Sequence, residues 1–194
     1  MKAVAFNGSP RKGGNTEQMI RFVLARLEAA GITTEYMQIG GRPFHGCTAC
    51  CKCRETKDNR CSIDNDPFND CLQKMLEADC IIIGSPTYVA DVTSETKALL
   101  DRTAYVVRAN GNPLMRKVGV ALSAVRRAGS IHALDTINHL FSVLGLYTVG
   151  SSYWNLCIGK DPGEVMDDPE GMRTLQDLAD NTAWLLKKIH VADA

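Results

Sequence analysis

The sequence lacks several features that would assign a protein to a large functional class. No apolar run approaches the roughly 20 residues of a membrane-spanning helix, and the start of the chain has no apolar core typical of a secretory signal. Neither sign of charge predominates, because Lys plus Arg and Asp plus Glu both number 22. We therefore expect a cytoplasmic protein that binds neither a membrane nor nucleic acid.

The sequence also lacks the glycine patterns of the common nucleotide-binding loops. Neither G-x-G-x-x-G nor the Walker pattern G-x-x-x-x-G-K-[ST] occurs, which argues against a typical dinucleotide or nucleoside triphosphate site. Internal repeats and low-complexity segments are missing as well. A chain of 194 residues with this composition is expected to form a single domain, residues 1–194.

Cysteine, by contrast, is abundant, and its eight copies in a chain without a secretory signal indicate a reducing compartment rather than a disulfide framework. Cys47, Cys50, Cys53 and Cys61 have the spacing C-x2-C-x2-C-x7-C, with Cys51 inside it. Iron–sulfur ligation uses such a spacing, whereas structural zinc sites more often split their ligands into two pairs. Three alternatives stay open for these cysteines: an iron–sulfur cluster, a zinc ion and no metal. Cys51 is expected either to replace a neighbouring cysteine as a ligand or to remain a free thiol.

Strand-like and helical segments alternate along the chain. The expected strands lie at 3–6, 33–39, 80–83, 118–122 and 146–149, and the expected helices at 15–30, from 66, at 94–107, at 130–144 and from 168. This alternation predicts an α/β fold with a flavodoxin-like, doubly wound, five-stranded parallel sheet of order 2-1-3-4-5. Residues 42–65 lack the hydrophobic periodicity of a helix or a strand and are interpreted as a cysteine-rich insertion after the second strand. Cys157 is expected in an irregular stretch after the fifth strand.

The loop after the first strand, residues 7–16, has the composition of an anion-binding loop. Its small residues let the backbone approach an anion, and the helix that follows directs its positive end to the same place. Ser9, Asn15 and Thr16 add side-chain donors. The loop therefore favours phosphate binding over a simple glycine-rich turn.

Two further loops are expected at the same edge of the sheet, where folds of this class bind ligands. Residues 84–91 offer backbone groups and the aromatic Tyr88 to a planar ring, although an ordinary turn explains them equally well. The loop expected to begin at Ser123, after the fourth strand, carries Arg126 and Arg127. An arginine pair is more often solvated, but its place at the strand edge makes ligand contact an equal alternative.

Two of these loops carry a family resemblance, through G-S-P-R and G-N-T at 8–16 and G-S-P-T-Y at 84–88. Over nearly its whole length the chain resembles the NADPH-dependent FMN reductase family of flavodoxin-like proteins. Its cysteine spacing resembles that of the iron–sulfur flavoprotein branch. The third loop departs from the paired glycines usual in relatives, since it has Ala124-Val125 and Ala128.

The resemblance implies FMN and a [4Fe–4S] cluster as cofactors. It implies that the cluster is bound by Cys47, Cys50, Cys53 and Cys61. For FMN it implies a phosphate held by Ser9, Arg11, Asn15 and Thr16 and a ring that lies against Pro86, Thr87, Tyr88, Val89 and the loop with Ser123 and Arg126.

We therefore predict an FMN-dependent oxidoreductase that passes electrons between a reduced donor, either ferredoxin or NAD(P)H, FMN and the cluster. No side chain has to act as a nucleophile, and Arg126 is expected to stabilise the reduced flavin. Two alternatives stay open: a cluster-free NAD(P)H-dependent reductase of FMN or quinones, and a non-enzymatic electron carrier. Relatives of this type commonly form dimers or tetramers, so we expect a homodimer or homotetramer with the cysteine insertion near the interface.

Overall fold

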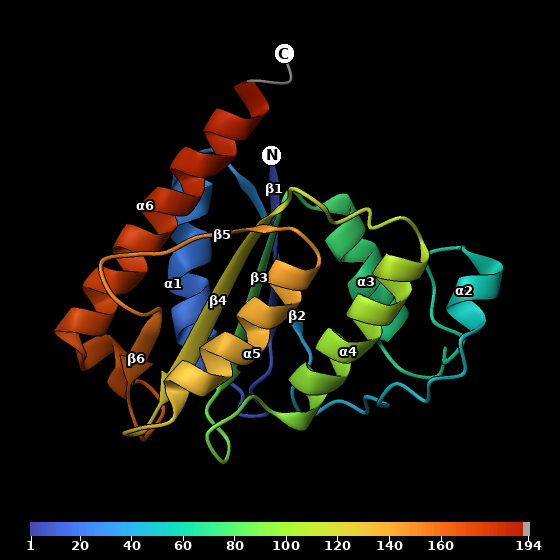
Figure 1. Ribbon diagram of the computed structural model, residues 1–194. Coiled ribbons are helices and arrows are strands. Elements are labelled where there is room, and N and C mark those ends of the chain that lie inside the picture. Colours follow the sequence, from blue (N-terminus) through green and yellow to red (C-terminus); the bar gives the residue numbers. More distant parts are fainter. Residues whose placement is uncertain (192–194) are drawn as a thin grey trace.

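A parallel sheet of order β2-β1-β3-β4-β5 forms the centre of the computed structural model, which describes residues 1–191 (Figure 1). Every pairing in it is parallel, so the predicted flavodoxin-like order is confirmed. The strands are β1 (Lys2–Asn7), β2 (Thr33–Gln38), β3 (Cys80–Pro86), β4 (Val118–Val125), β5 (Tyr147–Thr148) and β6 (Leu156–Ile158).

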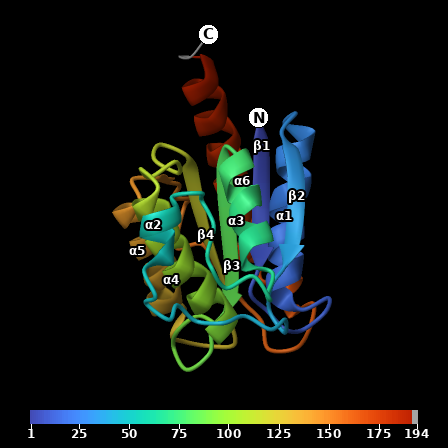
Figure 2. The ribbon, with the colours of Figure 1, turned by 90° about the vertical axis from the view of Figure 1, so that its right-hand side faces the viewer.

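Helices cover both faces of the sheet. They are α1 (Asn15–Ala29), α2 (Lys52–Thr56), α3 (Phe68–Glu77), α4 (Ser94–Ala109), α5 (Ser130–Val143), the 3-10 helix η1 (Glu164–Asp167) and α6 (Pro169–Val191). One face is covered by α1 and α6, and the other by α3, α4 and α5 (Figures 1 and 2). Within residues 1–191, no helix has both the length and the apolar character needed to cross a membrane.

The strands have continuous apolar sequences because both faces of the sheet are buried. Phe6 and Ile83 belong to the core under α3, α4 and α5, whereas Ala5 and Ile82 belong to the core under α1 and α6. Successive strand residues point to opposite faces, so each run of apolar residues supplies both cores.

The cysteine-rich segment lies outside these layers. Residues 42–65 pass along the outer side of α4, with α2 as their one helix, and reach the side of the molecule farthest from α6 (Figure 1). The segment follows β2 and contributes no strand to the sheet. The structure thus confirms its interpretation as an insertion.

The fifth position of the sheet holds two short strands instead of the single strand expected at 146–149. β5 pairs with the start of β4 and β6 pairs with its end. Both lie along the same edge of β4, because β3 occupies the other edge. The expectation that Cys157 lies in an irregular stretch was therefore wrong: it lies in β6 and is buried, and that burial raises its pKa to about 12.

β4 is longer than expected and continues to Val125. Its last three residues, Ser123–Val125, pair with β6, a partner that the sequence pattern did not reveal. Ser123 therefore lies inside a strand and not at the beginning of a loop. The third loop at this edge of the sheet begins at Arg126.

Candidate functional site

Hydrogen bonds donated by two amide side chains, those of Asn7 and Gln38, hold the loop between β1 and α1 in place. Asn7 Nδ2 donates to Tyr36 Oη at 2.9 Å and to Gln38 Oε1 at 2.8 Å. Gln38 Nε2 donates to the carbonyl oxygen of Ser9 at 2.6 Å. The Ser9 carbonyl is thereby satisfied inside the protein, which helps to fix the loop without any ligand.

The first turn of α1 fits an anion. Gly14 occupies the N-cap position and has no side chain to cap the helix, while the carboxylate of Glu17 accepts from the backbone N–H of Gly13, just before the helix, at 2.9 Å. Asn15 Oδ1 instead accepts from the backbone N–H of Gly163 at 2.8 Å. The N–H groups at this helix end remain available, and together with the helix dipole they favour a phosphate.

One hollow at the carboxyl edge of the sheet brings together eight of the ten residues predicted to bind FMN. The eight are Ser9, Arg11, Asn15, Thr16, Pro86, Thr87, Tyr88 and Arg126. They come from loops far apart in the sequence, so the strand order places them side by side.

Ala124, which belongs to the segment expected to lie against the ring, and three residues that the sequence did not indicate, Gly159, Lys160 and Asp161, complete the lining of this hollow. Glu164 Oε2 accepts hydrogen bonds from the backbone N–H groups of Lys160 and Asp161 at 2.6 and 3.0 Å, which hold this segment in place. With Arg11 and Arg126, Lys160 outweighs the single carboxylate of Asp161. The hollow is therefore suited to a phosphate dianion.

The other two predicted residues lie apart from the lining. Ser123 is completely buried, and its hydroxyl lies 3.1 Å from Oγ1 of Thr87, a residue that lines the hollow. Val89 is fully exposed at the tip of a turn closed by two backbone hydrogen bonds between Tyr88 and Asp91. Its φ of 49° is unusual for a β-branched residue.

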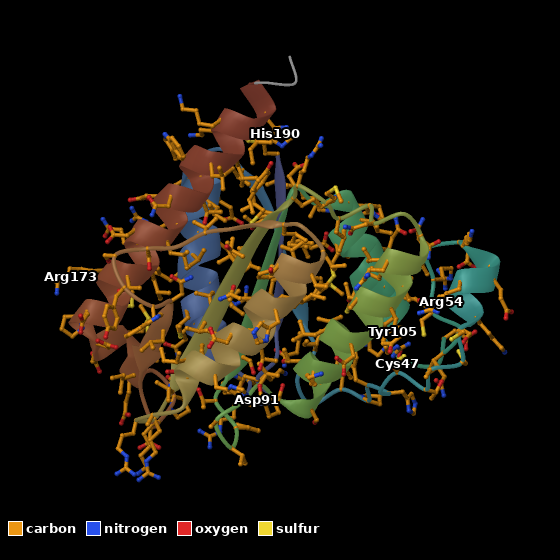
Figure 3. The ribbon with its side chains drawn as sticks, viewed as in Figure 1. Cys47, Arg54, Asp91, Tyr105, Arg173 and His190 are labelled. Carbon is orange, nitrogen blue, oxygen red and sulfur yellow. The ribbon has the colours of Figure 1, made fainter. Side chains whose placement is uncertain are left out.

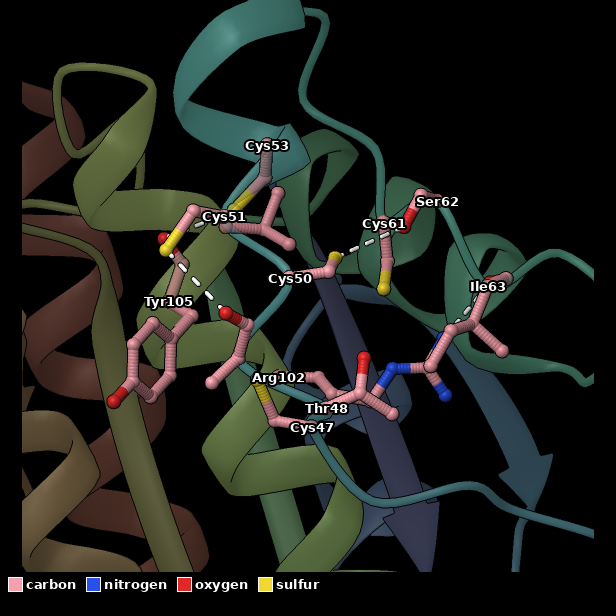
Figure 4. Close-up of a pocket in the computed structure, with 12 residues that line it drawn as sticks. Cys47, Thr48, Cys50, Cys51, Cys53, Cys61, Ser62, Ile63, Arg102 and Tyr105 are labelled. Carbon is pink, nitrogen blue, oxygen red and sulfur yellow. Dashed lines mark hydrogen bonds between the residues drawn. The ribbon is translucent and has the colours of Figure 1, made fainter.

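A second hollow lies between the cysteine-rich segment and α4, and all four predicted cluster ligands line it (Figure 4). Cys50 Sγ lies 3.3 Å from Ser62 Oγ, and this hydrogen bond is the main cause that lowers the pKa of Cys50. Burial raises the pKa of Cys53, and the neighbouring thiolates of Cys61, Cys50 and Cys47 raise it further. The four sulfur atoms are therefore close enough to influence one another.

Cys51 also borders this hollow but differs from the four in its backbone and contacts. It has a left-handed φ of 59° at the N-cap of α2, and its Sγ donates to the carbonyl oxygen of Ala49 at 3.5 Å.

Arg102 of α4 fixes both ends of this segment. Its Nη1 donates to Asp66 Oδ2 at 2.5 Å and to the His45 carbonyl at 3.2 Å, and its Nη2 donates to the Ile63 carbonyl at 2.9 Å. The guanidinium carbon lies 4.0 Å from the centroid of the Phe68 ring. Burial acts to raise the pKa of Asp66, but the bond from Arg102 and the N–H groups of His45 and Phe68 hold that pKa below its usual value.

Sequence reasoning missed Arg102 and Asp66. One signal was present, because Arg102 lies between the apolar residues Leu99 and Val106 at helical spacing. A charged residue on an otherwise apolar helix face indicates a buried partner.

A basic groove adjoins the cysteine hollow. Arg54 and Lys57 line it from the α2 side and Arg108 from α4, while Tyr105 lines both the groove and the hollow. Figure 3 shows Arg54, Tyr105 and Cys47 on one side of the molecule and Arg173 on the opposite side.

Comparison with solved structures identifies the same fold. RosB, crystallised with a bound riboflavin 5'-phosphate derivative, superposes with a TM-score of 0.75 at 20% identity, covering 98% of this chain and 81% of that one. A WrbA-like protein from Agrobacterium tumefaciens gives a TM-score of 0.65 at 16% identity, covering 96% of this chain and 97% of that one. At these identities the likeness shows the flavodoxin-like fold alone.

Comparison with protein sequences identifies the family. The family model described as NADPH-dependent FMN reductase matches residues 1–161. An iron-sulfur flavoprotein of Methanocaldococcus jannaschii is 33% identical, covering 97% of this chain and 99% of the relative. One from Methanosarcina thermophila is 32% identical, covering 97% of each. The chain therefore belongs to the NADPH-dependent FMN reductase family, in its iron–sulfur flavoprotein branch.

Proposed function

We propose that this protein is an FMN-dependent oxidoreductase that transfers electrons between a reduced donor, FMN and a [4Fe–4S] cluster. One observation carries the proposal: two separate hollows each gather the residues that one cofactor requires. The hollows share no lining residue, which supports a separate site for each cofactor. Family membership supports FMN, and the iron–sulfur relatives support the cluster.

The proposed FMN site divides into a phosphate part and a ring part. Ser9, Arg11, Asn15 and Thr16 hold the phosphate at the N-terminus of α1, and Tyr88 offers an aromatic surface to the ring. Bound FMN supplies two-electron chemistry with a donor and one-electron exchange with a cluster. The positive charge of Arg126 stabilises negative charge on the ring when it is reduced.

We propose that the cysteine hollow holds a cluster rather than a zinc ion. The spacing of Cys47, Cys50, Cys53 and Cys61 favours a cluster, because structural zinc sites more often have their ligands in two separated pairs. All four cysteines line one hollow, and the relatives named iron-sulfur flavoproteins support the cluster.

The basic groove supports a protein donor such as ferredoxin. Arg54, Lys57 and Arg108 form no ion pair within the described residues, and the groove borders the hollow proposed to hold the cluster. Unpaired positive charge next to a redox centre steers an acidic partner to it. NAD(P)H is the second candidate donor, since the FMN hollow is open and Tyr88 is 44% exposed.

We further propose a cytoplasmic homodimer or homotetramer. The free thiols of the cysteine-rich segment require a reducing compartment. The exposed aromatic pair Tyr153 and Trp154, with ring centroids 4.5 Å apart, offers a surface suited to a second copy of the chain. This surface shares no lining residue with the cysteine hollow, so it differs from the interface near the cysteine-rich insertion that the sequence led us to expect. Sedimentation of FMN-loaded protein as a monomer would contradict the assembly.

The decisive experiment measures iron, acid-labile sulfide, zinc and flavin per chain in protein prepared without oxygen. We expect one FMN and a full [4Fe–4S] complement, and no zinc. Flavin without iron, combined with steady NAD(P)H oxidation, would favour the cluster-free reductase. Reversible reduction by ferredoxin with negligible nicotinamide turnover would favour an electron carrier. Colourless protein that does not bind added FMN would contradict the proposal as a whole.

A further inference from the structure

The side chain of Asn69 binds the backbone of the cysteine-rich segment on both sides of one cysteine. Its Oδ1 accepts from the backbone N–H of Cys61 at 2.8 Å. Its Nδ2 donates to the carbonyl oxygens of Cys61 at 3.0 Å and of Ile63 at 3.3 Å. An asparagine amide has an acceptor oxygen and two N–H donors, so these bonds use its oxygen and both donors. Asn69 is 6% exposed, and water therefore competes little for the bonds.

Asn69 is itself fixed to the core of the protein. It is the second residue of α3, a helix whose apolar residues Phe68, Cys71 and Leu72 pack in the core under α3, α4 and α5. One side chain thus connects both backbone groups of Cys61 to the sheet and its helices.

The position of Cys61 is not set by local spacing, unlike that of the other three predicted ligands. Cys47, Cys50 and Cys53 recur at every third position, and Cys53 lies in α2. Cys61 lies outside the helices and strands and follows Cys53 only after seven intervening residues. A contact from another element has to hold it, and Asn69 of α3 supplies that contact.

The same contacts also fix Ser62. This residue lies between the two whose carbonyl groups accept from Asn69, and its Oγ lies 3.3 Å from Cys50 Sγ. Figure 4 shows Cys61 and Ser62 next to Cys50 at the cysteine hollow. Asn69 is not one of the residues that line this hollow, so any effect on an occupant is exerted through Cys61 and Ser62.

We propose that Asn69 is a positioning residue that holds Cys61 in place to bind the cluster, an inference that rests on the cluster assignment made above. A ligand whose backbone is fixed before the metal binds loses less conformational entropy on binding. Replacing a residue that orients a metal ligand typically weakens metal binding about 10–100-fold. Asn69 therefore contributes to retention of the iron atom bound by Cys61, although it touches no part of the cluster.

The first test measures hydrogen exchange at the backbone N–H of Cys61 in the full-length, metal-free protein by nuclear magnetic resonance. We expect slow exchange in the wild type, because Asn69 Oδ1 accepts from this N–H, and about tenfold faster exchange in Asn69→Ala. Fast exchange in the wild type would overturn the proposal, and this result does not require any variant to fold.

The second test follows loss of iron from anaerobic protein whose iron and sulfide have been measured. Ferricyanide accepts one electron from a [4Fe–4S]²⁺ cluster, which then releases one ferrous ion and leaves [3Fe–4S]⁺. Electron paramagnetic resonance detects the three-iron product, and a chelator detects the released ion. We expect the conversion to be about tenfold faster in Asn69→Ala than in the wild type. Equal rates, or loss of the whole cluster without a three-iron product, would overturn the proposal.

Asn110→Ala is the matched control. Asn110 Oδ1 also accepts from a backbone N–H of the cysteine-rich segment, that of Asn59 at 2.9 Å, but Asn110 binds no cysteine. This variant should release iron at the wild-type rate. An equal acceleration would show that Asn69 only tethers the segment, which would overturn its role at Cys61.

Failure of the cluster assignment gives a different result. Wild-type protein without iron and sulfide would contradict the proposed function, whereas the exchange rate of the Cys61 N–H in metal-free protein would still show whether Asn69 holds this residue.

Discussion

The two hollows of this protein are built by different means. The hollow proposed to bind FMN, called the FMN hollow below, lies where strands of the sheet end, so the pairing of β1, β3 and β4 sets the positions of its loops. The cysteine hollow is formed by a segment with one five-residue helix and no strand, fixed to α4 by the contacts of Arg102. The positions of the first hollow's residues follow from the fold, whereas those of the second depend on a few side-chain contacts.

The largest expected effect is the loss of one cofactor while binding of the other is unchanged. We expect Cys61→Ser to lower iron and sulfide per chain more than tenfold, because the cluster loses one of its four thiolates. FMN content should not change, since Cys61 does not line the FMN hollow. Elemental analysis and flavin absorbance measure both. Cys51→Ser is the control, and an equal loss of iron in that variant would show that the ligand assignment is wrong.

The next effect concerns the ion pair that holds the cysteine-rich segment. Asp66→Ala leaves Arg102 buried without its carboxylate, so we expect the free energy of unfolding to fall by about 3–5 kcal/mol. Urea unfolding of metal-free protein measures this loss. Asp64→Ala, two residues earlier at an exposed position, should change stability little, and an equal loss there would contradict the role of the pair.

The same pair has a defined dependence on pH. Its partners hold the pKa of Asp66 below the usual value in the folded state. Its contribution to stability is therefore fully present above the unfolded-state pKa of about 3.9 and is lost as the pH falls through the folded-state pKa. Unfolding measured across this acid range should show a shallower decline for Asp66→Ala than for the wild type. Parallel curves would refute this contribution.

A smaller effect is expected at the phosphate loop. Arg11→Ala removes one charged donor from the FMN hollow, which we expect to weaken FMN binding by about 1.5–3 kcal/mol, or roughly tenfold to a hundredfold in Kd. Quenching of flavin fluorescence on binding measures Kd. Lys12 is exposed and does not line the hollow, so Lys12→Ala should bind FMN almost as the wild type does. Cluster content should be the same in both variants.

The smallest effect concerns the basic groove next to the cysteine hollow. Arg54→Glu/Lys57→Glu reverses two of the three positive charges of the groove, and we expect reduction by an acidic ferredoxin to slow about tenfold at low salt. Stopped-flow kinetics at several salt concentrations measure this rate, and the difference should shrink as salt increases. Arg173→Glu, on the opposite side of the molecule, should have little effect (Figure 3). Equal rates for both variants would contradict docking at the groove.

Much of the fold was predictable because its signals are local. The runs at Ala3–Phe6 and Cys80–Ile83 indicate strands buried on both faces, and the alternation with helices implies the sheet order. The split of the fifth strand was not predictable, because β6 has only three residues and exists by pairing with the end of β4. The mistaken start of a loop at Ser123 has the same cause.

Each candidate site likewise contains residues that the sequence predicted and residues that it did not. Eight predicted FMN-binding residues lie together because they follow strand ends, whose positions the sheet sets. Lys160 lines the hollow because it follows β6, whose pairing with β4 the sequence did not indicate, whereas Val89 does not line it because its side chain is fully exposed. Arg102 is 36 residues from Asp66, and no local pattern connects the two.

The amino-acid sequence by itself determined the alternating elements, the cysteine spacing and the anion-binding loop, since each depends on neighbours within about ten residues. Tertiary structure alone decided that Lys160 joins Arg11 and Arg126 around the proposed FMN hollow and that Arg102 holds the cysteine-rich segment. Those contacts join residues far apart along the chain. They form only after the sheet has brought its strand ends together and the helices have packed against it.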